Sequence, residues 1–355
     1  MLRGEDAMTW INAEYRSPKL DWTFRCVAVH IRALFLVLAL LVAGAASAQA
    51  DPQRFHAGIA RITVQDVVPF DAVVAYPTGA GEVPSQDLAF TIAASRDAPI
   101  ATGALFPIVL FSHGGGRTLT AGGSPLPHAA LFTSLAREGF VVVAPFHPGS
   151  KNPGEAREDR PRQIHKALNA MLADPRFATH ADPNRLGMMG FSYGGAVALI
   201  VAGAVPDLAH LAAYCRDRTD DPKACDGVPT DGSLANVVGK RSPDALAMKA
   251  LVLMEPWGAL FDRNGLTSAD MPTLLYRAES SDLKAEGNIL ALAAALPHPP
   301  RQETVPGGHF IFVDPCPPAL EAEAPVSCKD APGVDRAAVH RRIEVEIGDF
   351  LRRNL

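Results

Sequence analysis

The sequence predicts an α/β fold with a mostly parallel central sheet, helices on both faces and an antiparallel hairpin at its start. After residue 106, apolar runs alternate with helical patterns, which is the order of strand–helix–strand units in a parallel sheet. Before that point, residues 58–64 and 70–76 are two alternating apolar runs close together in the chain. Such a pair is typical of a β-hairpin.

The individual elements follow from the same patterns. Strands of the parallel part are predicted at residues 107–111, 140–145, 185–191, 250–254, 272–277 and 301–305. Helices are predicted between them at 127–137, 160–173, 193–203 and 283–295, with a closing helix at 335–353. Residues 88–94 are expected to add a strand near the hairpin. Arg160 and Arg162 open one of the helices and are expected to be surface charges.

Residues 1–50 are expected to be a signal peptide, which leaves residues 51–355 as one large domain. An apolar run at 33–43 follows Arg25 and Arg32 and precedes small residues, with cleavage expected after Ala48 or Ala50. The run is shorter than the ~20 residues that a spanning helix needs. We therefore expect a periplasmic or secreted protein with no membrane span after cleavage.

Charge and cysteine content narrow the class of partner. The chain has a net charge of −5, and loss of residues 1–50, with five basic and four acidic side chains, makes it −6. That balance argues against a nucleic acid partner, because phosphate binding needs a basic surface. Four cysteines remain, and their spacing favours the disulfides Cys215–Cys225 and Cys316–Cys328, although the sequence leaves other pairings open. No Cys-x-x-Cys or clustered histidine accompanies them, so no metal site is expected.

The most informative motif lies between a predicted strand and a predicted helix. It is Gly190-Phe191-Ser192-Tyr193-Gly194, a G-x-S-x-G whose glycines allow a sharp turn. A serine on such a turn points its hydroxyl out of the sheet. The arrangement resembles the nucleophile elbow of the α/β-hydrolase fold, and it predicts that Ser192 is a nucleophile.

A serine nucleophile needs a base, and His309 is the best candidate. It lies in Pro306-Gly307-Gly308-His309-Phe310, directly after the last predicted strand. The chain order nucleophile, acid, histidine of α/β-hydrolases requires a histidine in this place. His309 is therefore the predicted general base.

Donors for an oxyanion are expected from the glycine-rich segment after the first parallel strand. Phe111-Ser112-His113-Gly114-Gly115-Gly116 exposes main-chain N–H groups without side chains in the way, as HGGG-type loops do. The predicted donors are the N–H groups of Gly115 and Tyr193. A phosphate-binding loop is rejected, because no Gly-Lys-Ser/Thr follows.

Three segments together resemble one group of α/β-hydrolases. The segments 110–119, with His-Gly-Gly-Gly-Arg-Thr-Leu, and 139–145, followed by the elbow, are similar to the platelet-activating-factor acetylhydrolase group. They are equally similar to bacterial proteins labelled "predicted dienelactone hydrolase", although true dienelactone hydrolases have a cysteine nucleophile where this chain has Ser192. The resemblance covers roughly residues 57–350. It implies a Ser-His-acid hydrolase that acts on carboxylic esters without a cofactor.

Two carboxylates compete for the role of the acid. Many α/β-hydrolases place it in a Gly-x-x-Asp turn after the strand predicted at 272–277, where this chain has Ser281 in the aspartate position and Asp282 one residue later. The acetylhydrolase group places its acid one strand earlier, in an Asp-x-Trp turn, which here reads Glu255-Pro256-Trp257. Glutamate can also orient an imidazole. The sequence favours Glu255 over Asp282 and keeps both.

The sequence therefore predicts an exported serine hydrolase that cleaves carboxylic esters through an acyl-enzyme. Residues 206–244 interrupt the strand–helix order and are expected to form a cap over the pocket, or otherwise a plain surface loop. The resemblance favours short-chain acyl esters. Alternatives are a lipase, phospholipase or polyester hydrolase, and, from other classes, an amidase or peptidase, or an inactive binding protein of the same fold. The partner is a small-molecule or lipid ester; the oligomeric state stays open.

Overall fold

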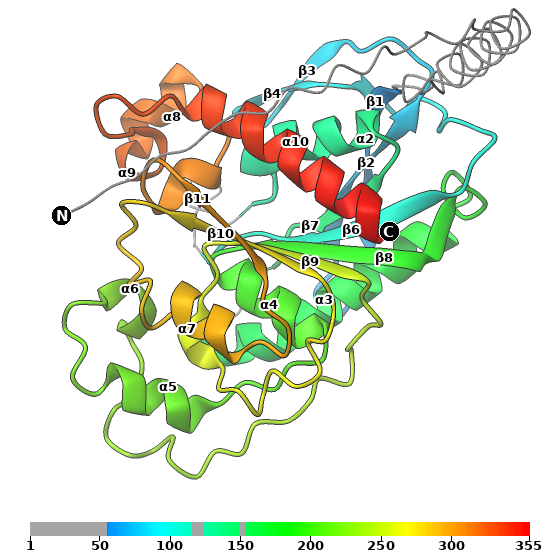
Figure 1. Cartoon of the computed structure of the whole chain (residues 1–355). Coiled ribbons are helices and arrows are strands. Elements are labelled where there is room, and N and C mark those ends of the chain that lie inside the picture. Colours follow the sequence, from blue (N-terminus) through cyan, green and yellow to red (C-terminus); the bar gives the residue numbers. More distant parts are fainter. Residues whose placement is uncertain (1–54, 116–123, 149–152) are drawn as a thin grey trace, which may run out of the picture. The chain divides into compact units, whose positions relative to one another are not determined.

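The computed structural model describes residues 55–115, 124–148 and 153–355, with the side chains of 153–156 left out (Figure 1). The predicted signal peptide and its cleavage sites lie outside the described residues, and so does Gly116 of the glycine-rich segment. The described residues form one compact unit.

A nine-stranded sheet forms the centre of this unit, in the order β11-β10-β9-β8-β6-β7-β2-β1-β5. Strands β6 to β11 run parallel to one another, whereas β2 is antiparallel to both β1 and β7. This is the strand arrangement of the α/β-hydrolase fold, so the predicted fold class is confirmed. The strands are β1 His56–Val64, β2 Phe70–Thr78, β5 Ser95–Arg96, β6 Phe106–Ser112, β7 Val141–Pro145, β8 Ala181–Phe191, β9 Ala250–Met254, β10 Thr273–Ala278 and β11 Arg301–Val305.

The N-terminal hairpin is present as predicted. Strands β1 and β2 pair from His56↔Thr78 to Val64↔Phe70. The strand expected at 88–94 is β4, Phe90–Ala93, which pairs with β3, Pro84–Asp87, in a separate two-stranded sheet. The short strand β5 then continues the main sheet beside β1.

Helices cover both faces of the main sheet (Figure 1). Helices α2 (Ala129–Arg137) and α10 (Arg336–Asn354) pack on one face, and α3 (Pro153–Ala173) and α4 (Tyr193–Val201) pack on the other. Every residue of β7 is buried, because a strand covered on both faces has no polar side. The remaining helical segments outside the cap are η1 Leu126–His128, η2 Gly258–Leu260, α7 Ile289–Ala295, η3 His309–Phe312, α8 Pro318–Glu323 and α9 Pro325–Cys328.

The helix predicted at 283–295 is shorter than expected. It begins at Ile289, and residues 285–288 before it form a turn. A Cβ on Gly287 would lie 2.1 Å from the ring of Tyr214, so the chain passes too close to the cap for a continued apolar helix face. The prediction failed here because it took the apolar pattern without this contact.

The segment expected as a cap consists of short helices and turns. Within it lie α5 (Leu208–Cys215) and α6 (Pro222–Cys225). Both favoured disulfides are present: Cys215–Cys225 joins these two helices, and Cys316–Cys328 closes a loop near α9, with Cα–Cα distances of 5.3 and 5.5 Å. Across the described residues, the structure contains no helix with the length and apolar character required to cross a bilayer.

Candidate active site

Ser192 lies on the turn between β8 and α4, where its backbone is held in a left-handed conformation. Its φ and ψ angles are 54° and −120°, which a residue with a Cβ adopts only under constraint from its surroundings. Here the main-chain N–H of Ser192 donates to the carbonyl of Met254 at the end of β9, and its carbonyl accepts from the N–H of Trp257. The neighbouring strand therefore fixes the turn.

The two glycines of the G-x-S-x-G motif are required by close main-chain contacts. A Cβ on Gly190 would lie 2.2 Å from the carbonyl oxygen of Gly194. A Cβ on Gly194 would lie 1.9 Å from the carbonyl oxygen of Ser112 at the end of β6. Both contacts are far below van der Waals distance, so only glycine allows helix α4 to begin this close to the sheet.

A hydrogen-bonded chain of three side chains starts at this serine. His309 Nε2 lies 2.9 Å from Ser192 Oγ, and His309 Nδ1 lies 3.3 Å from Glu255 Oε2. The three residues follow strands β8, β11 and β9, whose carboxyl ends meet at one edge of the sheet. The imidazole packs against the Phe191 ring at 5.1 Å.

Glu255 is fully buried and its carboxylate is well provided with donors. Its Oε1 accepts from the main-chain N–H of Ala278 at 2.6 Å, and its Oε2 accepts from the Ser281 hydroxyl. Its own φ is 47°, a second left-handed residue beside Ser192. Ser281, which occupies the position where many α/β-hydrolases have the acid, thus donates to Glu255.

Asp282 points elsewhere. Its carboxylate is 63 % exposed and lies 3.0 Å from the ammonium of Lys223 on α6. No hydrogen bond joins it to His309 among the described residues. The geometry brings Ser192, His309 and Glu255 together and leaves Asp282 outside this group.

The predicted oxyanion donors lie beside Ser192. A Cβ on Gly114 would lie 3.5 Å from Ser192 Cβ, and a Cβ on Gly115 would lie 3.5 Å from Tyr193 Cβ. Tyr193 is also the first residue of α4, so its N–H belongs to the positive end of that helix. The main chains of Gly115 and Tyr193 therefore adjoin the serine on one side.

Arg160 on α3 contacts this glycine-rich segment. Its burial corrects the expectation that it is a surface charge. It is 8 % exposed, and its guanidinium donates to the carbonyl oxygens of His113 at 2.7 Å and Gly114 at 3.2 Å. The residue was missed because α3 was expected to begin there. In fact α3 starts earlier, and Arg160 shares the buried face of Ile164, Ala167, Leu168 and Met171 at helical spacing. That spacing was the available signal.

Arg162 fits the surface expectation better. Its side chain is 32 % exposed and pairs with Asp159 on the same helix at 2.8 Å and with Asp66 at 3.2 Å. The two arginines therefore differ in the partner they bind: carboxylates for Arg162 and main-chain carbonyls for Arg160.

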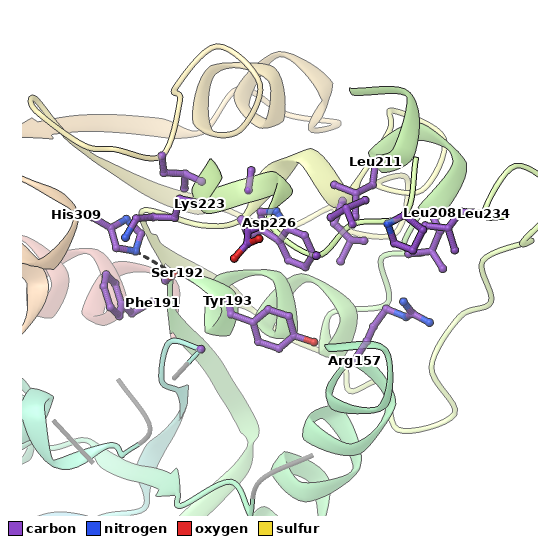
Figure 2. Close-up of a pocket in the computed structure, with 18 of the residues that line it drawn as sticks. Arg157, Phe191, Ser192, Tyr193, Leu208, Leu211, Lys223, Asp226, Leu234 and His309 are labelled. Atoms are coloured by element: carbon purple, nitrogen blue, oxygen red, sulfur yellow. Dashed lines mark hydrogen bonds between the residues drawn. The ribbon is translucent and has the colours of Figure 1, made fainter. Parts of the chain in front are cut away.

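A cavity of about 660 Å³ opens at Ser192 and His309. Figure 2 shows the Ser192–His309 pair at one end and Arg157 toward the other, with Tyr193 across from the cap side chains. The cap contributes apolar groups that include Leu208, Leu211 and Leu234, and the core contributes Trp257 and Phe310. Side chains between Leu208 and Val237 thus line part of this cavity, and a cap formed by the whole segment 206–244 stays a prediction.

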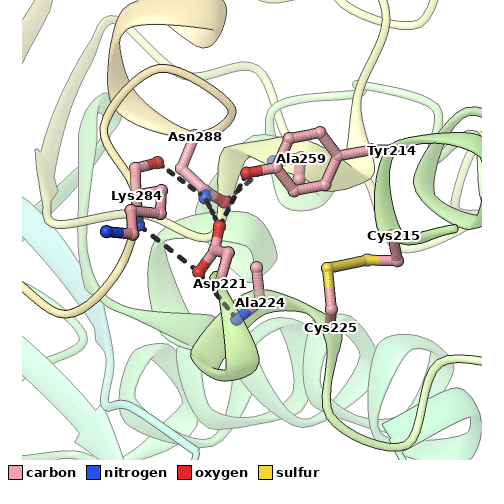
Figure 3. The surroundings of a disulfide bond; sticks show 8 residues. All are labelled: Tyr214, Cys215, Asp221, Ala224, Cys225, Ala259, Lys284 and Asn288. Atoms are coloured by element: carbon pink, nitrogen blue, oxygen red, sulfur yellow. Dashed lines mark hydrogen bonds between the residues drawn. A yellow bond between two sulfur atoms is a disulfide. The ribbon is translucent and has the colours of Figure 1, made fainter. Parts of the chain in front are cut away.

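A buried carboxylate in the cap anchors this wall (Figure 3). Asp221 is fully buried and accepts from the Tyr214 hydroxyl at 2.7 Å and from Asn288 Nδ2 at 3.0 Å. It also accepts from the main-chain N–H groups of Ala224 and Lys284. These bonds join α5 and α6 of the cap to the segment that precedes α7.

Comparison with known proteins finds likenesses among solved structures. No family model matches the sequence, and no curated protein matches it. Among solved structures, the chain is similar to one from a study of two fungal esterases of Rhizomucor miehei. That match has a TM-score of 0.46 and 15 % identity, and it covers 86 % of this chain and 84 % of the other. The fold class rests on the strand order described above and not on this likeness.

Proposed function

We propose that this protein is a serine hydrolase that cleaves carboxylic esters. The observation that carries the proposal is the hydrogen-bonded chain from Ser192 Oγ, on the turn between β8 and α4, through His309 to Glu255. A serine, a base within hydrogen-bond reach and a carboxylate that orients the base are the parts that acyl transfer requires.

In this proposal His309 Nε2 accepts the proton of the Ser192 hydroxyl as its Oγ attacks the ester carbonyl. The N–H groups of Gly115 and Tyr193 stabilise the oxyanion of the tetrahedral intermediate. The C–O bond to the alcohol then breaks, and the alcohol leaves with the proton from His309. Water next attacks the acyl-enzyme with His309 as base, which releases the carboxylic acid and restores Ser192.

Glu255 is proposed as the acid of the triad. Its burial and its contact with His309 Nδ1 suit a carboxylate that holds the imidazole with Nδ1 protonated and stabilises the imidazolium. Asp282 is instead proposed to hold Lys223, because it pairs with that ammonium and is mostly exposed.

The cavity adds a second candidate for the substrate. Short-chain acyl esters are the class that the sequence resemblance implies. A mostly apolar cavity of about 660 Å³ is larger than an acetyl group needs and lies within the range of drug-sized ligands. Esters with a larger apolar group, such as lipid esters or polyesters, are therefore the second candidate.

Export to the periplasm or the cell exterior is proposed from the apolar run at 33–43 and its small-residue flank. Two disulfides agree with an oxidising compartment. Intact mass of the protein recovered from the cell would test this proposal: a chain that begins at Gln49 or Asp51 is expected. A recovered chain that retains the apolar run would contradict it.

Hydrolysis of p-nitrophenyl esters from acetate to palmitate tests the reaction. We expect activity in the wild-type protein and a loss of at least about 10⁴-fold in Ser192→Ala. Ser233→Ala, which changes an exposed serine in the cap, is the matched control and should retain activity. The chain-length optimum separates the two substrate candidates.

A fluorophosphonate probe tests the nucleophile independently of the substrate. It should label the wild-type protein at Ser192 and leave Ser192→Ala unlabelled. Labelling without ester hydrolysis would point to an amidase or peptidase. The absence of both would favour a binding protein of hydrolase fold and would contradict the proposed function.

A further inference from the structure

Arg160 is a buried cation that binds the main chain of the glycine-rich segment. Its guanidinium donates to two successive carbonyls, those of His113 and Gly114. Hydrogen bonds from a charged donor are stronger than those between neutral groups, and a planar guanidinium fixes its acceptors in direction as well. The path of the main chain at residues 113–115 is thus tied to helix α3.

The Gly114 carbonyl shares a peptide unit with the N–H of Gly115, one of the two predicted oxyanion donors. In a trans peptide the C=O and the N–H point in opposite directions. A guanidinium that holds the carbonyl of Gly114 therefore turns the Gly115 N–H away from α3. The same hydrogen bond polarises the peptide and strengthens its N–H as a donor.

Arg160 also contacts the residue that carries the second predicted donor. Its guanidinium carbon lies 5.0 Å from the centre of the Tyr193 ring, within the range of a cation–π contact. One side chain thus touches both Gly114 and Tyr193, which belong to the two segments that adjoin Ser192.

The charge of Arg160 has no carboxylate partner among the described side chains. Among the residues whose side chains the structure describes, no Asp or Glu oxygen lies within ion-pair distance of it, in contrast to Arg162. Burial lowers the pKa of Arg160 to about 10, so the group stays protonated at neutral pH. A positive charge therefore lies behind the peptide that faces the reacting carbonyl.

We propose that Arg160 is a positioning residue of the oxyanion hole: it orients and polarises the Gly114–Gly115 peptide and holds Tyr193 beside it. The inference rests on the proposed function of Ser192 and deepens it, because it assigns a role to a side chain outside the triad. Its effect belongs to the transition state, where the oxyanion charge develops, and not to binding of the ground-state ester.

Kinetics of Arg160→Met and Arg160→Lys test this role, with Arg162→Met as the matched control on the same helix. Using p-nitrophenyl butyrate, we expect Arg160→Met to lower kcat about 10- to 100-fold with KM changed less than about threefold. Arg160→Lys should fall between this variant and the wild type, because one ammonium keeps the charge without the fork that spans two carbonyls. Arg162→Met should keep the wild-type kcat.

A trifluoromethyl ketone inhibitor supplies a readout that a purely structural role would not move. It forms a tetrahedral adduct with Ser192 whose oxygen occupies the oxyanion position. Its inhibition constant should rise in Arg160→Met by about the factor that kcat falls, while KM stays nearly constant. Should Arg160→Met fail to fold, as judged by thermal unfolding, the comparison is made with Arg160→Lys.

The inference is overturned if a folded Arg160 variant retains the wild-type kcat, or if kcat falls while the inhibition constant does not change. Failure of the proposed function looks different, because the wild-type protein itself would then hydrolyse no ester. In that case the rate of fluorophosphonate labelling at Ser192 replaces kcat. An unchanged labelling rate in Arg160→Met would overturn the inference.

Discussion

Two residues of the candidate site, Ser192 and Glu255, have left-handed backbone angles although neither is glycine. They follow the paired strand ends Phe191 and Met254, which are partners in the parallel ladder of β8 and β9. Such conformations cost about 1–3 kcal/mol each and persist where the surrounding structure fixes them. The ladder thus holds a serine and a carboxylate at the same edge in conformations that isolated turns would avoid.

Glu255 and Asp282 are the two candidates for the acid. Glu255→Gln should lower kcat for ester hydrolysis by about 10³- to 10⁴-fold, because an amide no longer stabilises the imidazolium or fixes its tautomer. Asp282→Asn should change kcat less than about threefold, since its carboxylate is mostly exposed and paired with Lys223. Steady-state kinetics of both variants decide between them, and the reverse result would assign the role to Asp282.

Ser281→Ala should have a smaller effect on kcat than Glu255→Gln. Loss of the hydroxyl that donates to Glu255 Oε2 removes one hydrogen bond from a buried carboxylate. We expect a decrease in kcat of about 3- to 30-fold, the size of one such bond. An effect as large as that of Glu255→Gln would instead indicate that Ser281 has a more direct role.

At the scale of the elements, helix α6 is held in place by a network much larger than the helix itself. Asp221 at its start binds Tyr214 of α5 and Asn288 before α7. Lys223 within it pairs with Asp282 and lies 4.8 Å from the ring centre of Phe310. A four-residue helix has little stability of its own, so its position as a wall of the cavity depends on these contacts.

Asp221→Asn should therefore change substrate selectivity. The new side-chain amide places N–H groups opposite the Tyr214 hydroxyl and the Asn288 amide, which are themselves donors. Buried polar groups are then left without an acceptor, at a cost of about 2–4 kcal/mol. We expect kcat/KM for p-nitrophenyl octanoate to fall about tenfold, with little change for the acetate. Activity assays well below the unfolding temperature measure this.

The matched control for this variant is Asp220→Asn. Asp220 is the preceding residue, is 55 % exposed and lies 3.8 Å from Arg218, so its loss should change neither selectivity nor stability. If Asp221→Asn lowered the activity on both esters by the same factor, the cap would not be a selective wall of the cavity.

At the scale of the whole molecule, buried histidines link stability to pH. His128 is buried among aromatic rings, with Phe111 at 4.8 Å and Phe191 at 5.4 Å. Burial lowers the pKa of His128 to about 4, with the charge of Asp314 opposing the shift and that of His340 adding to it. Burial likewise lowers the pKa of His147 well below its ordinary value.

These shifts predict loss of stability in acid. Between pH 6.5 and 4 the unfolded chain binds a proton at His128 that the folded chain does not, so the free energy of unfolding falls as pH falls. The contribution of His128 is about 3 kcal/mol across that window. Chemical unfolding of wild type and His128→Leu at pH 7 and 4.5 should show a smaller pH dependence in the variant. Equal dependence in both would contradict the assignment.

His340 acts in the opposite direction. Burial lowers its pKa, but the hydrogen bond and charge of Asp314 outweigh burial and leave the pKa above its ordinary value. Its stabilisation is complete below the unfolded pKa and is lost as pH rises through the folded value. His128 thus lowers the free energy of unfolding as the pH falls, whereas His340 lowers it as the pH rises.

The sequence alone determined the order of strands and helices along the chain. It also identified two of the side chains that lie in contact at the candidate site, Ser192 and His309. The apolar runs predicted the strands because a buried strand must be apolar whatever packs on it. Ser192 and His309 were identifiable because each lies in a glycine-rich turn directly after such a strand. The short spacings favoured the two disulfide pairs and left other pairings open, and the structure contains the favoured ones.

Tertiary structure alone decided which groups approach these residues from other parts of the chain. That Glu255 contacts His309 while Asp282 pairs with Lys223 depends on how the ends of β9 and β10 lie beside β11 and α6. The burial of Arg160 depends on where α3 begins, and the shortened α7 depends on the approach of Tyr214 to Gly287. Local patterns fix which residues face the core; contacts between distant segments, set by packing, fix the partners that each polar group finds.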